Sequence, residues 1–160
     1  MTGQQARRDR DRAFDVLASD ASDAVVRAAF AELVDAHPLD AASRASFAHV
    51  LAGVGDQREA LVQAHRALEL GPGDYLVALD VTRLLIKLGN LEVAEGLLDE
   101  AGEVVGDGPL SAIALWWYVR AMLREAQGDL PGAISSLEEA VARDPSDPDV
   151  LANLARLRAV

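Results

Sequence analysis

A short motif recurs three times along the chain and constrains its fold more than any other feature. The motif is Gly, then Asp or Asn, with Ala five residues after the Gly, and its copies begin at Gly55, Gly89 and Gly128. The first two copies lie 34 residues apart (89 − 55) and the last two lie 39 apart (128 − 89), which is one period with five residues inserted. Repetition at such a period is typical of arrays in which each unit stacks on the next.

Each copy of the motif is followed by a helical pattern. Apolar residues recur three and four positions apart, as they do on one face of a helix, and the run ends at a Gly or Pro cluster. The Gly should end one helix, because it tolerates the left-handed backbone of a helix terminus. The next residue, which is Asp56, Asn90 or Asp129, is expected to cap the helix that follows.

The composition agrees with a helical fold. Hydrophobic residues make up 51% of the chain but aromatic residues only 4%, so the apolar mass is mainly Ala, Leu and Val. Ala and Leu favour helices, and Ala lets two helices approach closely, whereas a β-sandwich needs more Ile, Thr, Tyr and Phe. The predicted fold class is all-α.

Charge and cysteine content exclude several classes of partner and site. The net charge of −11 repels nucleic acid and anionic membranes, so we expect neither as a partner. The absence of cysteine excludes disulfides, thiol catalysis and cysteine-based metal sites. The first twelve residues are polar and lack the apolar core of a signal peptide, and no apolar run approaches membrane-spanning length. We therefore expect a cytoplasmic protein.

The repeated motifs resemble the tetratricopeptide repeat, a helix–turn–helix unit of 34 residues. The resemblance implies a right-handed α-solenoid of antiparallel helix pairs, with about three to four repeats in a single domain spanning 1–160. The repeats would occupy 41–74, 75–108 and 114–147, after a degenerate repeat at 7–40 and before a capping helix at 148–160.

The resemblance also assigns core positions. Ala60, Ala64 and Ala67 would pack one helix pair, and Ala133 and Ala140 another. In the degenerate repeat, Phe14 and Leu17 fall on the first helix and Val26, Phe30 and Leu33 on the second; in the capping helix, the apolar residues are Leu151, Leu154 and Ala155.

The region before the third repeat departs from the regular period. Gly102, Gly106 and Gly108 coincide with the five inserted residues, so we interpret them as a helix terminator and a linker. Trp117 matches the core Trp of the family. Trp116, its neighbour, is expected to pack against the preceding unit or the inserted residues, since consecutive helical residues point about 100° apart.

Residue types that carry out catalysis do not form a recognisable site. His37, His49 and His65 are not arranged as metal ligands, and the glycines before the third repeat lack the Lys and Ser or Thr of a phosphate-binding loop. We therefore expect no enzyme activity, no metal and no cofactor.

Proteins with this fold bind partners in a concave groove lined by the first helix of each repeat. Mapping the inward positions onto this chain gives candidate contacts that are mostly polar or aromatic. They are His49, Asp80, Arg83, Lys87, Tyr118, Met122, Glu125, Asn153 and Arg156. The predicted function is a non-catalytic adaptor or scaffold that binds a peptide, a helix or a folded protein.

Two other functions remain open. The terminal helix could stack on another copy, which would make the chain a self-assembling structural unit and a homo-oligomer. The segment Ala31–Leu39 resembles the helical activation domain of bacterial transcriptional activators, so the chain could instead be a helical regulatory domain.

Overall fold

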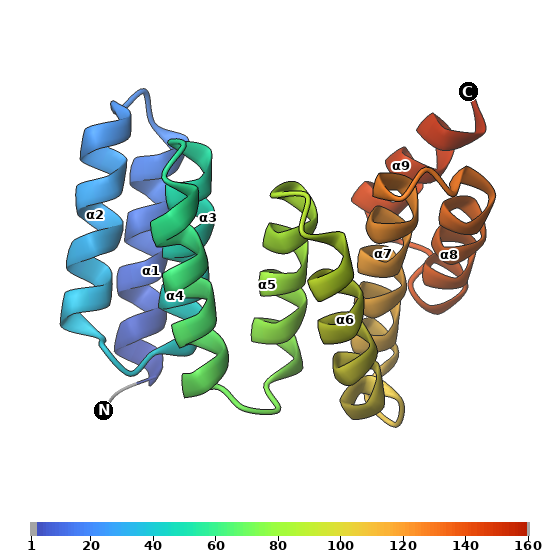
Figure 1. The fold of residues 1–160 in the computed structure, drawn as a ribbon, viewed down its shortest axis with the longest axis horizontal. Coiled ribbons are helices and arrows are strands. Elements are labelled where there is room, and N and C mark those ends of the chain that lie inside the picture. The colour runs from blue at the N-terminus through green and yellow to red at the C-terminus, as the bar shows by residue number, and fades with distance from the viewer. Residues whose placement is uncertain (1–2, 160) are drawn as a thin grey trace. The chain divides into compact units, whose positions relative to one another are not determined.

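The computed structural model describes residues 3–159, which form nine α-helices and no strand, as predicted (Figure 1). The chain divides into two compact units, one up to Val77 and the other from Ala78 onward. The helices are α1 (Gly3–Ala18), α2 (Asp23–Ala36), α3 (Ala41–Gly53), α4 (Gln57–Leu70), α5 (Tyr75–Lys87), α6 (Leu91–Val105), α7 (Leu110–Ala126), α8 (Leu130–Arg143) and α9 (Pro148–Arg158).

The three motif glycines make tight turns between antiparallel helices. Gly55, Gly89 and Gly128 have φ angles of 87°, 77° and 83°, in the left-handed region that side chains disfavour. Each turn has three residues, between α3 and α4, α5 and α6, and α7 and α8. The fold is therefore the all-α, tetratricopeptide-like solenoid type that the sequence predicted.

The residues after these glycines cap the next helix in two of three cases. Carboxylate oxygens of Asp56 and Asp129 accept hydrogen bonds from the backbone N–H groups of Glu59 and Gly132, at 3.3 and 2.9 Å. Asn90 occupies the same position before α6 but makes no side-chain capping bond. The prediction that Asn90 caps through its side chain is therefore wrong, although the helix still begins there.

The five inserted residues lengthen helices and do not form a loop. α7 has 17 residues where α3 and α5 have 13, and α6 has 15 where α4 and α8 have 14. The connection between α6 and α7 is only residues 106–109. Gly102 lies inside α6, so the prediction that it terminates a helix is wrong; the turn consists of Gly106, Asp107, Gly108 and Pro109.

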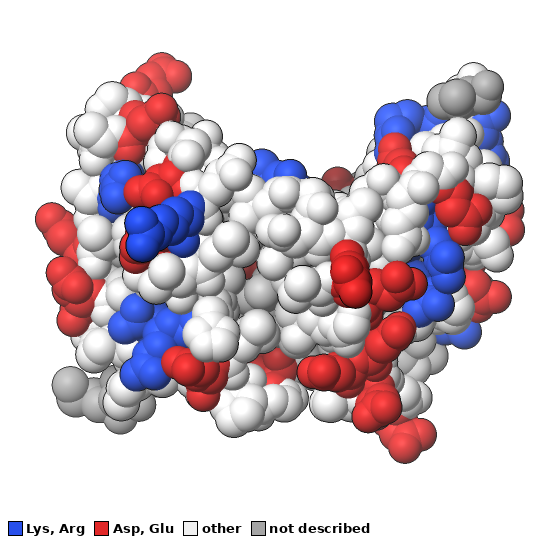
Figure 2. Space-filling model, viewed as in Figure 1, with Lys and Arg blue, Asp and Glu red and all other residues white. Residues whose placement is uncertain are grey.

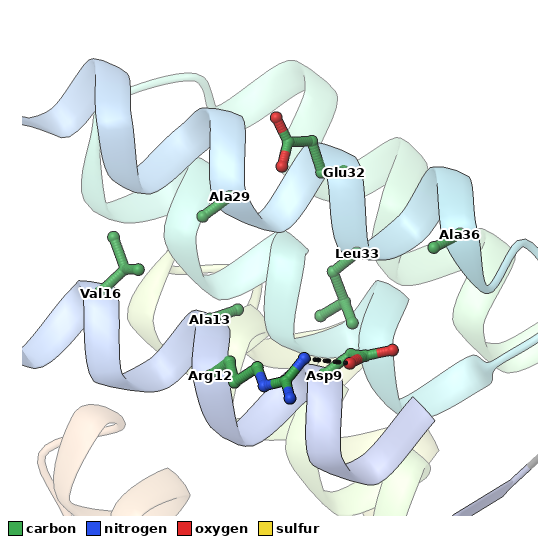
Figure 3. A pocket seen from close by; sticks show the side chains of 8 residues that line it. All are labelled: Asp9, Arg12, Ala13, Val16, Ala29, Glu32, Leu33 and Ala36. Carbon is green, nitrogen blue, oxygen red and sulfur yellow. Dashed lines mark hydrogen bonds and ion pairs between the residues drawn. The ribbon is translucent and has the colours of Figure 1, made fainter. Parts of the chain in front are cut away.

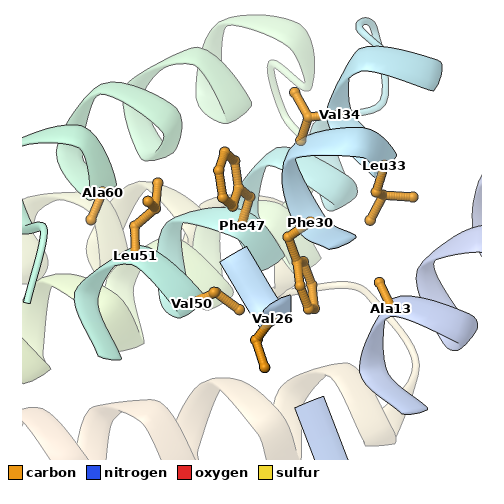
Figure 4. Close-up of a cluster of buried hydrophobic side chains, with 9 residues drawn as sticks. All are labelled: Ala13, Val26, Phe30, Leu33, Val34, Phe47, Val50, Leu51 and Ala60. Atoms are coloured by element: carbon orange, nitrogen blue, oxygen red, sulfur yellow. The ribbon is translucent and has the colours of Figure 1, made fainter. Parts of the chain in front are cut away.

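The core of the first unit joins α1, α2, α3 and α4. Figure 4 shows its side chains, which are Ala13, Val26, Phe30, Leu33, Val34, Phe47, Val50, Leu51 and Ala60. The predicted core residues of α2 are buried here. Phe14 and Leu17 lie on α1 as expected but are 43% and 45% exposed, because α1 buries its small residues Ala6 and Ala13 instead.

The core of the second unit is built on the small residues of α8. Ala133 and Ala140 are fully buried, and Leu137 lies between them on the same face. Trp117 packs against this cluster, as the family pattern implies. α9 contributes Val150, Leu154 and Leu157, whereas Leu151 and Ala155 face solvent, which corrects two of the three positions predicted for that helix.

No helix within residues 3–159 combines the length and the hydropathy needed to span a bilayer.

Candidate functional site

The second unit carries a polar cluster shared by α7 and α9. Four of the predicted contact residues take part in it, namely Tyr118 and Glu125 on α7 and Asn153 and Arg156 on α9. Tyr118 and Glu125 are two helical turns apart, and Asn153 and Arg156 are one turn apart, so each pair projects from one face of its helix. One contact joins Tyr118 to Asn153, and another joins Arg156 to Glu125. A hydrogen bond between Arg156 and Asn153 connects the two contacts.

A bidentate ion pair holds the C-terminal end of this cluster. The two terminal nitrogens of Arg156 each lie 2.8 Å from a carboxylate oxygen of Glu125. The hydrogen bond from Arg156 lowers the pKa of Glu125, and the same bond raises the pKa of Arg156. Both side chains remain substantially exposed, so the pair orients the guanidinium more than it stabilises the fold.

The phenol of Tyr118 holds the other end of the cluster. The Nδ2 group of Asn153 donates a hydrogen bond to the Tyr118 hydroxyl oxygen at 3.2 Å, and Asn153 Oδ1 accepts one from Arg156 at 3.1 Å. Burial raises the pKa of Tyr118, and the negative charge of Asp149 raises it further. The Tyr118 side chain is half-buried and neutral, with its hydroxyl available as a donor.

The other predicted contacts are less closely connected. Arg83 on α5 is exposed, lies 3.8 Å from Asp80, and acts on Tyr118 through its positive charge. Lys87 is exposed and Met122 is half-buried. His49 lies on α3, in the first unit, and is half-buried.

This cluster has the chemistry of a recognition surface. It offers guanidinium donors, a carboxylate acceptor and an aromatic ring, which together suit the backbone and side chains of a peptide. Within residues 3–159, no group of three or more His, Asp or Glu side chains lies close enough together to hold a metal ion.

A second feature of this unit was only partly visible in the sequence. Trp116 lies against α6, and its Nε1 donates a hydrogen bond to the carbonyl oxygen of Leu98 at 2.8 Å. A Cβ on Gly102 would stand 3.0 Å from that nitrogen, so a larger residue there would press on the indole. Trp116 therefore packs on the preceding helix, one of the two expected locations. A glycine inside a helical pattern was the available signal.

The first unit has a shallow pocket between α1 and α2, about 260 Å³ in volume (Figure 3). Its charged side chains include Arg12 and Asp9, which pair at 3.3 Å. Asp9 also accepts from His37 Nε2 at 2.9 Å, and this bond is the largest cause of its lowered pKa. His37 therefore joins α1 to the end of α2, a role that its sequence position did not reveal.

Comparison with known proteins identifies one stretch of the chain as similar to a repeat family. Residues 113–157, which include most of α7, all of α8 and most of α9, match the family model described as "Tetratricopeptide repeat". No curated protein sequence matches the chain.

Solved structures resemble most or nearly all of the chain. MamA from Desulfovibrio magneticus RS-1, residue 41 to its end, is 21% identical with a TM-score of 0.63; the match covers 99% of this chain and 86% of that one. A double mutant of MamA RS-1 gives 20% identity and a TM-score of 0.62 over the same shares. The APC/C hetero-tetramer Cut9–Hcn1 contains a chain that is 19% identical, with a TM-score of 0.66, covering 84% of this chain and 26% of that one. At these identities the likeness concerns the fold.

Proposed function

We propose that this chain, which has a tetratricopeptide-like fold and matches the model of that family over residues 113–157, is a non-catalytic interaction module that binds another protein. The observation that carries the proposal is the connected cluster of Tyr118, Asn153, Arg156 and Glu125. A peptide, a helix or a loop of a folded partner would lie across α7 and α9.

The preformed geometry of the cluster favours binding. Arg156 is already held by Glu125 and Asn153, so little side-chain entropy is lost when a partner arrives. Tyr118 adds a half-buried aromatic surface with a polar tip, which is common at the centre of interfaces. Arg83, Lys87 and Met122 would extend this surface, whereas His49 stays a separate candidate contact on the first unit. A partner that presents carboxylates or backbone carbonyls matches the remaining donors of Arg156.

Affinity capture from the native host with paired variants tests this proposal. Tyr118→Ala combined with Arg156→Glu should abolish capture of the specific partner. Arg158→Glu is the matched control, because Arg158 is exposed on the same helix and pairs with Glu138, outside the cluster. If both variants retain the partner, or both lose it equally, α7 and α9 do not provide the binding surface.

Self-assembly is a second candidate, favoured by one observation on the terminal helix. Leu151 on α9 is 43% exposed and Ala155 is exposed as well, which leaves a small apolar face. Light scattering over a range of concentrations distinguishes the two functions. A mass that rises above 17.0 kDa, and falls back in Leu151→Glu, would support stacking between copies. The regulatory-domain hypothesis and the cytoplasmic location stay predictions.

A further inference from the structure

A pocket between α6 and α7 brings both tryptophans of the chain to one place. It has a volume of about 430 Å³, and it is separate from the Tyr118 cluster in the residues that line it. Its walls are largely apolar, formed by Trp116, Trp117, Ile113 and Val105, with glycines between them. Asp99, Glu103 and Arg120 complete the lining.

The aromatic side of the pocket is held in place before any ligand binds. Trp116 is fixed by its hydrogen bond to the Leu98 carbonyl and by its contact with Gly102. The two indole rings meet edge to face, with centroids 4.9 Å apart and an interplanar angle of 81°. Both tryptophans are only partly buried, so ring surface stays accessible at the pocket.

Cations of the chain itself already lie over the indole faces. The Arg120 guanidinium is 5.0 Å from the Trp116 ring centroid, and that of Arg143 is 5.5 Å from the Trp117 ring. Arg120 is in turn paired with Asp99 at 3.4 Å. A bare cation would have to compete with these arginines for the rings, so the pocket itself suits an apolar side chain better.

The segment that forms one wall of this pocket is acidic. The segment 88–119 contains six carboxylates, Glu92, Glu95, Asp99, Glu100, Glu103 and Asp107, and no Lys, Arg or His. Figure 2 shows acidic side chains gathered over α6. Among the described residues only Asp99 of these six has an ion-pair partner, so the segment keeps a net negative charge, which Glu103 brings to the pocket wall.

We propose that the pocket between α6 and α7 receives an apolar side chain of a protein partner, in a segment where Lys or Arg residues flank it. The apolar residue fills the space between Ile113 and the two indole rings, and the flanking cations face Glu103 and its acidic neighbours. Nucleic acid and anionic lipid are excluded as occupants by the sign of the charge. This site adds a second partner contact to the one proposed above and rests on different residues.

A peptide array provides the probe. Each twelve-residue peptide has a Gly and Ser background with one central apolar residue, flanked by two Arg, two Glu or two Ser on each side. We expect the Arg-flanked Leu, Met or Phe peptides to bind about tenfold more tightly than their Glu-flanked counterparts, and less tightly as salt is raised. Tryptophan emission reports the site directly, because the chain has only Trp116 and Trp117.

Variants on the full chain separate the pocket from general charge attraction. Glu103→Lys should weaken binding of the best Arg-flanked peptide about tenfold. Asp35→Lys makes the same change in net charge at an exposed position on α2 and should leave the affinity unchanged. Ile113→Asn should weaken binding through loss of the apolar wall, with circular dichroism used to confirm that it folds.

Three outcomes overturn the proposal. Arg-flanked peptides that bind no better than Glu-flanked ones, binding without a change in tryptophan emission, or equal losses in Glu103→Lys and Asp35→Lys would each do so. Arg156 lies outside the pocket, so Arg156→Glu should bind the peptide as tightly as the wild type does. The test of the pocket therefore does not depend on whether the Tyr118 cluster binds a partner.

Discussion

At the scale of single residues, Gly102 leaves room for the indole of Trp116, which lies 14 positions further along the chain (116 − 102). It lies inside α6, where glycine is a poor helix former. The indole of Trp116 occupies the space that a Cβ would need, with three of its atoms between 3.0 and 3.2 Å from that position. Gly96, in the same helix, has no atom within 4 Å of its own Cβ position.

These two glycines should respond oppositely to the same substitution. Gly96→Ala should raise the free energy of unfolding by about 0.5–1 kcal/mol, because alanine favours the helix. Gly102→Ala should lower it by about 1 kcal/mol, because displacement of Trp116 outweighs that gain. Urea titration followed by tryptophan emission measures both. If Gly102→Ala were as stabilising as Gly96→Ala, the indole would not pack on α6 as described.

Tyr118 provides a prediction about pH. Its raised pKa means that the folded protein holds the phenol proton more tightly than the unfolded chain does. The corresponding stability is present below the ordinary tyrosine value of 10.0 and is lost as pH rises through the higher folded pKa. The ultraviolet difference between wild type and Tyr118→Phe should show phenolate forming above pH 10.0, and near that value once the protein is unfolded in urea. A folded midpoint below 10.0 would contradict the description of its surroundings.

At the scale of helices and turns, the corresponding turns have equal lengths although the helices that they join do not. The three glycine turns have the same length, and so do the three four-residue connections from α4, α6 and α8 to the next helix. The five inserted residues are absorbed almost entirely as an additional turn at the beginning of α7. A turn of helix keeps the backbone hydrogen-bonded, whereas a loop of that size would not. The longer α7 and α6 provide Ile113 and Val105, which line the pocket.

The helix caps give a matched test at this scale. Asp129→Ala should lower the free energy of unfolding by about 1 kcal/mol, because it removes the acceptor for the Gly132 N–H. Asn90→Ala should cost clearly less, since Asn90 makes no side-chain capping bond in the corresponding position. Urea unfolding of both variants measures the difference. Equal costs would mean that the position, and not the hydrogen bond, determines cap strength here.

At the scale of the whole molecule, net charge decides which partners can approach. The chain has 26 acidic residues against 15 Lys and Arg. Six of the acidic residues lie in the single segment 88–119, which contains no basic residue. Long-range repulsion therefore acts on polyanions, while the same field attracts basic protein segments.

We predict that the full chain binds neither duplex DNA nor vesicles rich in phosphatidylserine, even at low ionic strength where attraction would be strongest. Gel-shift and vesicle co-sedimentation assays measure this. A charge-reversed variant with Glu100→Lys, Glu103→Lys and Asp107→Lys provides the comparison, since any gain of binding in it would show that the acidic segment is what repels these ligands. Retention of the unmodified chain by either polyanion would contradict the prediction.

The sequence alone determined the three glycine turns of this protein and the helices that flank them. A glycine with positive φ, a capping Asp and Ala at helical spacing act within a few residues of one another, so their effect does not depend on the rest of the fold. This locality explains why the turns at Gly55, Gly89 and Gly128 were predicted correctly.

Tertiary structure decided which face of each helix is buried and which polar groups meet. α1 buries alanines and leaves Phe14 exposed, and α9 buries Val150 and leaves Leu151 exposed, although all of these residues are compatible with a helix core. Arg156 meets Glu125 across 31 residues, and Trp116 meets Gly102, only because particular helix faces pack together. The repeated glycine motif does not predict these contacts, because the motif is the same in each repeat and the contacts differ between repeats.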